Sequence, residues 1–294
     1  MRGSVLMTYK FKCRIAIISF LLLTILPFFY IAAGSHAQNS TVGRKSIVVP
    51  IIIYHNIKYN NLSQLTIAPY EFESDLQYLK TSGYTTITID DLIKYQENAE
   101  ILPEKPIILS FDDGYLNTYV YAYPLLRDYN MRAVLSIIGK DTDDFSKINI
   151  TDLNYAHINW NQVINMQNSG IFEIQNHSYN LHLATIDRYG CLKKPGESND
   201  HYEKVLTDDL TLLQREVYEK TGVTPTAFTY PYGKISNESV PLIKKLGFKA
   251  SLTCDYGINI ITNDPEDLYG LKRIARYHNV TLKKTLAEGL KTLH

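Results

Sequence analysis

The chain has 294 residues, of which 45% are apolar, and its 30 lysines and arginines balance its 30 aspartates and glutamates. This length fits one large α/β domain, or two small ones, with an ample core. Because the net charge is zero and the sequence shows no basic patch, a nucleic-acid partner is excluded.

The N-terminal part of the chain is predicted not to belong to the folded domain. A basic cytoplasmic segment at 1–14 precedes an apolar run at 15–33, and a small, polar linker follows at 34–46. The run is about 19 residues long, which exceeds a typical signal core and just suffices to span a bilayer. We therefore expect a signal or transmembrane segment, with an uncleaved membrane anchor favoured over a cleaved peptide and a buried core helix as the remaining alternative. In either of the first two cases the domain at 47–294 lies at the extracellular face of the membrane or is secreted.

Beyond the linker, β-type runs alternate with helical ones. The strands expected in chain order are residues 47–54, 85–89, 106–111, 133–138, 172–175, 226–230, 250–254 and 269–274. The expected helices are residues 70–81, 90–98, 117–129, 161–169, 202–221, 237–246 and 282–290. A polar stretch at 187–200 is interpreted as a surface loop. The alternation predicts an α/β fold, a distorted (β/α) barrel of seven to eight strands in a single domain.

In such a barrel, side chains at the carboxyl ends of the strands meet at one rim. Asp112 and Asp113 follow one expected strand, and His177, Tyr232 and Arg273 belong to the ends of three others. We therefore expect these five residues to open onto the same rim.

The residue types at this rim are those of a metal site. Two adjacent carboxylates, Asp112 and Asp113, repel each other and lose water when buried, so a cation is expected to compensate them. His177 and His182 would lie about 140° apart on a regular helix, and a loop is expected to bring both to one ion. Two imidazoles with one carboxylate suit zinc, with cobalt, nickel or iron as alternatives.

The chain resembles the polysaccharide deacetylase family, the carbohydrate esterases with NodB homology, over roughly residues 48–280. It is most similar to the branch of exported poly-N-acetylglucosamine deacetylases. The segments that carry the resemblance are residues 50–55 (PIIIYH), 110–114 (SFDDG), 177–182 (HSYNLH), 228–233 (FTYPYG) and 271–274 (LKRI).

The resemblance implies a role for each residue at the rim. Asp113, His177 and His182 would hold a divalent metal, and Asp112 would be the general base. The backbone N–H of Tyr232 would help to bind the oxyanion that develops on the carbonyl oxygen.

The chain departs from the family pattern in two places. Many relatives carry an arginine in the third motif that pairs with the base, whereas this chain has Thr229 near that place, so Arg273 is the expected substitute. Relatives also use a late histidine as general acid. Residues 271–274 contain none, which leaves His278 and His55 as candidates.

These features lead to the hypothesis of an exported, membrane-anchored, metal-dependent hydrolase that removes N-acetyl groups from N-acetylglucosamine units of a cell-wall or extracellular polysaccharide. Its expected partners are the acetylated glycan and, through the N-terminal segment, the membrane. The alternative enzyme would act on O-acetyl esters, as xylan-type esterases do. The alternative from another class is a glycan-binding surface protein with a decayed catalytic site, since the usual arginine and acid are missing.

Overall fold

A computed structural model describes residues 46–97, 100–262 and 264–293. The cytoplasmic segment predicted at 1–14, the signal or transmembrane segment at 15–33 and nearly all of the linker at 34–46 lie outside these ranges. Within the described ranges, no helix is both long and apolar enough to cross a membrane.

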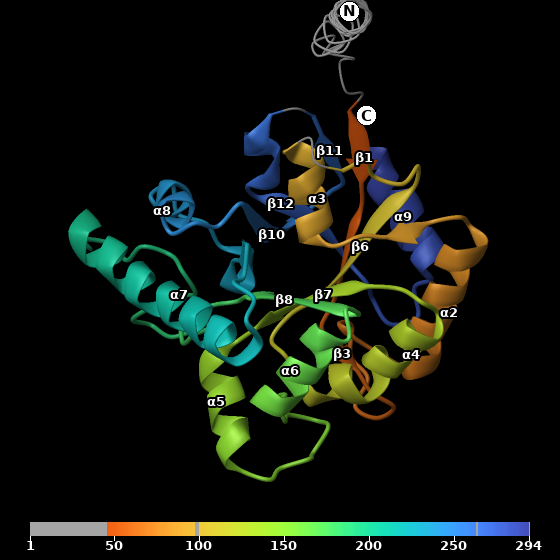
Figure 1. Cartoon of the computed structure of the whole chain (residues 1–294), viewed down its shortest axis with the longest axis horizontal. Helices are drawn as coiled ribbons and strands as arrows, with labels where there is room; N and C mark the ends of the chain where they lie inside the picture. The colour runs from red at the N-terminus through yellow and green to blue at the C-terminus, as the bar shows by residue number, and fades with distance from the viewer. Residues whose placement is uncertain (1–45, 98–99, 263, 294) are drawn as a thin grey trace, which may run out of the picture. The chain divides into compact units, whose positions relative to one another are not determined.

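Seven parallel strands close into a barrel (Figure 1). Their order around the ring is β2-β12-β10-β9-β8-β7-β6, and β6 closes it by pairing with β2 along four residues, from Ile51 opposite Ile108 to Tyr54 opposite Phe111. The predicted (β/α) barrel is therefore confirmed. The strands are β2 (Ile51–Tyr54), β6 (Pro106–Phe111), β7 (Ala133–Ile137), β8 (Phe172–Asn176), β9 (Ala227–Thr229), β10 (Ala250–Tyr256) and β12 (Leu271–Ala275).

Two predicted strands differ clearly from those in the structure. The strand expected at 47–54 is divided at Pro50, which lacks an N–H, into β1 (Ile47–Val49) and β2. β1 pairs antiparallel with β11 (Asn259–Ile261), a strand that was not predicted. The strand expected at 85–89 reduces to β5 (Thr85–Thr86), which pairs with β6, because Thr88 caps the following helix. A further short parallel pair joins β3 (Asn56–Ile57) and β4 (Thr66–Ile67).

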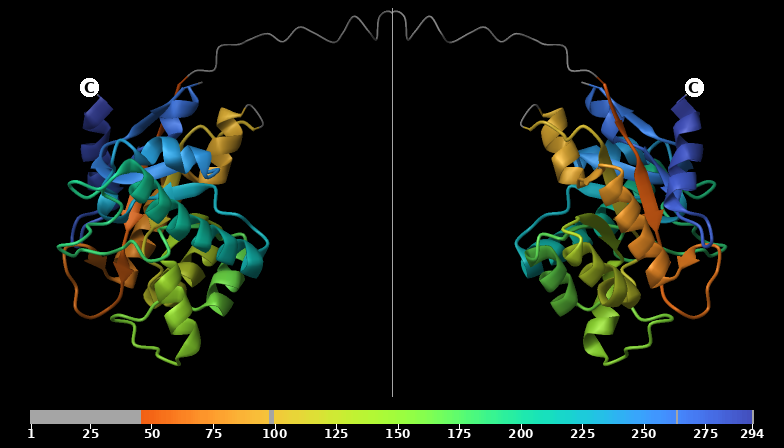
Figure 2. Two further views of the ribbon diagram at one scale, coloured as in Figure 1. Left: turned by 90° about the vertical axis from the view of Figure 1, so that its left-hand side faces the viewer. Right: turned by 90° about the vertical axis from the view of Figure 1, so that its right-hand side faces the viewer.

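The predicted helices all appear on the outside of the barrel or at its ends (Figures 1 and 2). They are α2 (Pro69–Thr81), α3 (Ile89–Gln96), α4 (Tyr123–Asp128), α6 (Trp160–Asn168), α7 (Asn199–Thr221), α8 (Ser239–Lys245) and α9 (Leu282–Leu290). A π-helical turn, η1 (Thr118–Ala122), precedes α4, so the single helix predicted at 117–129 is irregular in its first half. Short 3₁₀ turns occur at η2 (Pro231–Gly233), η3 (Pro265–Leu268) and η4 (Lys291–Leu293).

The helix α5 (Gly139–Lys147) was not predicted. Its sequence, GKDTDDFSK, has no apolar stripe that could indicate a buried face. Gly139 and Thr142 are its buried residues, and a Cβ on Gly139 would lie 2.5 Å from a Tyr179 ring carbon. This helix therefore depends on close backbone packing, which hydrophobic periodicity does not reveal.

The side chains of β6 point alternately to two parts of the core, and this alternation continues to the rim. Ile107, Leu109 and Phe111 pack in the cluster outside the barrel, while Ile108 packs in the inner one. Successive side chains of a strand point to opposite faces, so Ser110 and then Asp112 continue the inward face. The Phe111 ring stacks on Tyr54 of β2 at 5.2 Å between centroids, which fixes the ends of two neighbouring strands just before the functional residues begin.

Candidate active site

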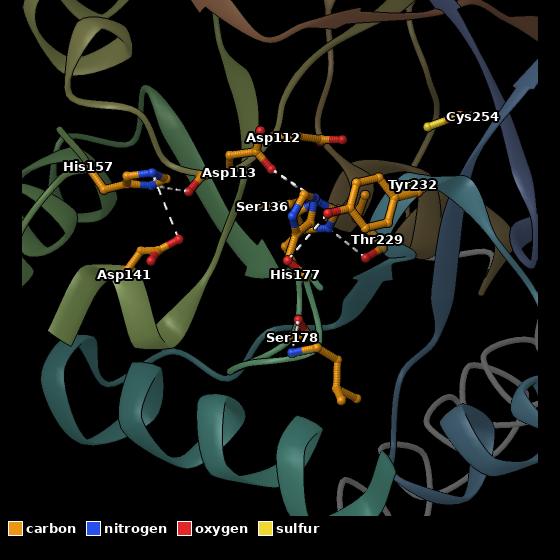
Figure 3. Close-up of polar contacts among 12 residues, drawn as sticks. Asp112, Asp113, Ser136, Asp141, His157, His177, Ser178, Thr229, Tyr232 and Cys254 are labelled. Atoms are coloured by element: carbon orange, nitrogen blue, oxygen red, sulfur yellow. Dashed lines mark hydrogen bonds and ion pairs between the residues drawn. The ribbon is translucent and has the colours of Figure 1, made fainter. Parts of the chain in front are cut away.

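The residues predicted at the rim lie together at the carboxyl ends of the strands, and Figure 3 shows Asp112, Asp113, His177 and Tyr232 there. Asp112 and Asp113 directly follow β6, and His177 directly follows β8. Tyr232 lies in η2, just beyond β9, and Arg273 lies within β12. Asp113 and Tyr232 have positive φ angles of 69° and 58°, which side-chain-bearing residues rarely adopt. Such strain persists only where the surroundings enforce it.

Asp113, His177 and His182 form a group that could hold a metal ion. The Oδ1 atom of Asp113 lies 3.4 Å from Nε2 of His177 and 3.3 Å from Nε2 of His182. The same oxygen is buried and has no hydrogen-bond partner among the described residues. Burying an unsatisfied carboxylate oxygen is costly. This donor set, two imidazole nitrogens around an orphaned carboxylate oxygen, therefore fits a divalent cation.

The charges of the group act on each other. Burial raises the pKa of Asp113, but the neighbouring His177 and His182 outweigh this effect, and the net pKa lies below the usual value. Burial lowers the pKa of His177, but the neighbouring carboxylates of Asp113 and Asp112 outweigh this effect, so the pKa of His177 is raised. A bound cation would take the place of the second proton that each imidazole carries when it is charged.

His177 is oriented by a hydrogen bond on its other ring nitrogen. Nδ1 lies 2.7 Å from the backbone oxygen of Thr229, so Nδ1 carries the proton and Nε2 is left to face Asp113. The Thr229 hydroxyl is in turn 2.7 Å from the hydroxyl of Ser136. Thr229 thus contributes its carbonyl to the position of His177.

The segment between the two histidines is a loop, as predicted. The carboxylate of Asp209, on α7, accepts the backbone N–H groups of Tyr179 and Asn180 at 2.8 Å each. Ser178 Oγ accepts the N–H of Leu181 at 3.1 Å. These bonds turn the chain back so that His182 reaches the same oxygen of Asp113 as His177.

Asp112 is held by Arg273 through two parallel hydrogen bonds of 2.8 Å. Both side chains are buried, and Arg273 also donates to the Thr253 carbonyl at 2.6 Å and to Ser110 Oγ at 3.0 Å. Burial raises the pKa of Asp112, but the charges of Arg273 and His177 and the Arg273 hydrogen bonds outweigh it, so that its pKa is lowered. Asp112 is therefore a carboxylate at neutral pH, and Arg273 lies where the sequence hypothesis placed the missing cation.

The two candidate acids lie in different surroundings. His278 Nδ1 is 2.7 Å from Oε2 of Glu71, near the start of α2, and does not join the rim group. His55 follows β2, and its Nδ1 is buried without a hydrogen-bond partner in the described part of the chain. Burial lowers the pKa of His55, and the negative charges of Asp112 and Asp113 oppose this decrease. The three side chains therefore lie close enough for their charges to interact.

His157 belongs to the site but was not predicted. Its Nδ1 lies 3.0 Å from the backbone oxygen of Asp113, and its ring packs on Tyr115 at 4.7 Å between centroids. On the other side, Nε2 is 3.8 Å from Asp141 of α5 (Figure 3). The sequence around His157 follows no recognisable motif, so the residue type alone could have indicated it. The contact supports the strained backbone of Asp113.

The fold and the site define a class of protein: a (β/α) barrel with a potential cation site at its carboxyl rim, beside an ionised carboxylate. The family model "Polysaccharide deacetylase" matches residues 99–251, and the chain belongs to this family.

Relatives and solved structures agree with this assignment. A poly-beta-1,6-N-acetyl-D-glucosamine N-deacetylase of Staphylococcus aureus is 24% identical over 230 residues, which are 77% of this chain and 73% of the relative. The Escherichia coli protein of the same name is 24% identical over 254 residues, 79% of this chain but 37% of that longer relative. The Streptococcus pyogenes deacetylase PplD, solved with acetate, superposes with a TM-score of 0.67 at 22% identity, over 83% of this chain and 99% of that one. At this identity the likeness to PplD shows the fold.

The Asp112–Arg273 pair gives a prediction about stability. Arg273→Gln should lower the free energy of unfolding by about 3 kcal/mol, because Asp112 would remain buried as an uncompensated charge. In an Asp112→Asn background the same change should cost much less, which urea unfolding of the four proteins measures as a coupling free energy.

Arg215→Gln is the matched control, because Arg215 forms an exposed pair with Glu219 on α7. It should change stability by less than about 1 kcal/mol. An equal cost of Arg273→Gln in both backgrounds would contradict the pairing.

Proposed function

We propose that this protein is a metal-dependent hydrolase that removes N-acetyl groups from N-acetylglucosamine units of an exported polysaccharide. The observation that carries the proposal is the juxtaposition of two carboxylates in different states. Asp113 shares an orphaned oxygen with His177 and His182, whereas the adjacent Asp112 is ionised and held by Arg273. The names of the S. aureus and E. coli relatives support the choice of substrate.

Asp113, His177 and His182 would hold the ion, for which zinc is the first choice and cobalt, nickel or iron are alternatives. When bound, the ion supplies Lewis-acid chemistry, which polarises the acetyl carbonyl and lowers the pKa of water. The chain supplies the base: Asp112 accepts the proton of the attacking water, and Arg273 fixes the direction of its two oxygens.

Tyr232 would act through its backbone. Its N–H is proposed to donate to the carbonyl oxygen as negative charge develops there. The turn that presents this group is tightly constrained, because a Cβ on Gly233 would lie 2.3 Å from the backbone nitrogen of Cys254. Only glycine fits at Gly233, so the left-handed conformation of Tyr232 is maintained.

His55 is the proposed proton donor for the leaving amine. As the carbon–nitrogen bond breaks, the amine nitrogen needs a proton, and the carbonyl carbon keeps the oxygen that came from water. His55 lies among the charged groups of the rim, while His278 is bonded to Glu71. Asp112, Arg273, His55 and Tyr232 together offer each protein group that the reaction needs. This supports a working hydrolase over a glycan-binding protein with a decayed site.

For the rest of the chain we propose the organisation expected from the sequence. Residues 1–14 would remain cytoplasmic, 15–33 would form the signal or membrane anchor, and 34–46 would link it to the deacetylase domain at 47–294. The domain would then act at the extracellular face of the membrane or after secretion, where an exported glycan is accessible.

The substrate proposal predicts acetate release. Chitotetraose-type and β-1,6-linked N-acetylglucosamine oligomers should release acetate with the metal-loaded protein, and chelation should abolish release until a divalent ion is restored. Enzymatic measurement of acetate checks this, with acetylated xylan oligomers in parallel. Release from xylan alone would assign the O-acetyl esterase activity instead, and release that resists chelation would refute metal dependence.

Substitutions of the proposed base, Asp112, and of a proposed metal ligand, His177, should have different effects on metal content. Asp112→Asn should keep the metal and reduce kcat by at least about 10²-fold, because the proton acceptor is lost. His177→Ala should lose the metal itself, because one of three ligands is removed. Metal content by mass spectrometry, measured beside kcat, distinguishes the two effects. Equal metal loss in both variants would overturn the assignment.

The two candidate acids give a matched pair of variants. His55→Gln should reduce kcat by about 10²-fold or more while the metal stays bound. His278→Gln removes the same chemical group from outside the rim and should leave kcat within about threefold of wild type, since it touches no reacting group. Steady-state kinetics on the acetylated oligomer decides between them, and the reverse order of effects would assign the acid to His278.

A further inference from the structure

The loop at residues 183–197, which connects His182 to α7, is fixed to the barrel. We call it the 183–197 loop. Within it, the N–H of Gly190 donates to the Leu183 carbonyl at 2.7 Å, and Arg188 pairs with Glu197 at 2.5 Å. Its outer end is tied by the N–H of Lys193, which donates to Ser236 Oγ at 2.9 Å. The position of its side chains is therefore defined relative to the catalytic rim.

Gly190 lets this loop approach the turn that carries Tyr232. Its φ is 57°, and a Cβ at this position would lie 2.9 Å from the Pro231 carbonyl oxygen and 3.3 Å from a ring carbon of Tyr232. A side chain here would push the loop away from η2. Glycine at this position thus brings the neighbouring residue, Tyr189, against the site.

Three aromatic rings follow one another outward from the potential metal site. The His182 ring lies 4.3 Å from the Tyr232 ring, and the Tyr232 ring lies 4.7 Å from the Tyr189 ring, with 24° between the last two planes. Tyr189 is nevertheless 42% exposed. Tyr232 covers part of this ring, and the exposed part remains available to a ligand that lies beside the metal site.

We propose that Tyr189 forms a binding subsite for the pyranose ring next to the sugar that is deacetylated. This inference rests on the proposed function and deepens it, because it makes the enzyme prefer oligosaccharides to small acetylated compounds. The acetyl group of the reacting sugar must reach His182 and its neighbours. The adjoining sugar of the same glycan would then lie beside Tyr189, the outermost of the three rings.

The chemistry of the surroundings favours an uncharged sugar. A tyrosine ring combines an apolar face, which suits the C–H groups of a pyranose, with a hydroxyl that can bond to sugar oxygens, and it loses little conformational freedom on binding. The neighbouring cation, Arg188, is buried and paired with Glu197, so it is not free to attract an anionic ligand.

Binding and turnover of the metal-loaded full chain test the subsite. Tyr189→Ala should weaken binding of the N-acetylglucosamine tetramer by about threefold to tenfold, measured by calorimetry in the inactive Asp112→Asn background. In the otherwise unaltered enzyme, the same change should raise KM for the tetramer more than it lowers kcat. The ratio of kcat/KM for the tetramer to kcat/KM for 4-nitrophenyl acetate should fall by about threefold to tenfold.

Three further variants sharpen the test. Tyr189→Phe keeps the ring and should retain most of the affinity. Gly190→Ala keeps Tyr189 but displaces it, and should weaken tetramer binding. Tyr218→Ala removes an exposed tyrosine from the far part of α7 and should change neither measurement. Thermal unfolding shows whether each variant is folded.

The outcomes separate the subsite from the proposed function. If wild type binds the tetramer but releases no acetate from it, the proposed activity fails, while the binding measurement still decides the subsite. Equal losses on tetramer and ester, no loss of tetramer affinity in Tyr189→Ala, or no tetramer binding by wild type would each overturn the subsite.

Discussion

The structure of the site depends on how two adjacent, buried carboxylates are each compensated. Asp112 and Asp113 are consecutive in sequence, yet their side chains have different partners. Arg273 holds Asp112 through two hydrogen bonds, and His177 and His182 approach one oxygen of Asp113. Two carboxylates in different environments take different chemical roles. This division suits one of them for binding a cation and the other for accepting a proton.

The barrel makes this division possible because it joins distant parts of the chain. Asp112 and Arg273 are 161 residues apart, and they meet because β6 and β12 both pair with β2. The inward alternation of Ile108, Ser110 and Asp112 then directs the carboxylate toward the arginine, which Ser110 also contacts. An arginine inside a barrel is costly unless it is fully bonded. Here its donors go to Asp112, Ser110 and the Thr253 carbonyl.

Much of this arrangement could be predicted from the sequence, and the reason is physical. Continuous apolar runs indicate parallel strands, and parallel strands in a barrel bring their carboxyl ends to one rim. That argument alone placed Asp112, His177 and Arg273 together. The need for a cation beside Asp112 selected Arg273 once Thr229 occupied the usual position. The sequence did not decide between His55 and His278 as the general acid, because that choice depends on the contact between His278 and Glu71.

Other parts of the site lay beyond sequence reasoning because their placement depends on contacts between distant segments. Helix α5 has no apolar stripe, and it carries Asp141, which lies 3.8 Å from His157. His157 lies against the backbone of Asp113 only because two loops meet. Likewise, nothing in a polar stretch indicates that Gly190 allows a close approach to η2. A surface loop was predicted at residues 187–200, but its position beside the rim could be recognised only in the folded structure.

Backbone strain in the site is concentrated where these unpredicted contacts occur. Asp113, Ser178 and Tyr232 have φ angles of 69°, 77° and 58°. Such conformations cost about 1–3 kcal/mol each and persist only when the surroundings determine them. His157 bonds to the Asp113 carbonyl, Asn176 accepts the Ser178 N–H at 2.8 Å, and the glycine at 233 allows the Tyr232 turn. Because these supports are hydrogen-bonded or closely packed, the potential metal-binding group and the Tyr232 N–H are held in place before any substrate binds. An arrangement that is fixed in advance does not have to be organised during the reaction, which is the condition under which electrostatic stabilisation is most effective.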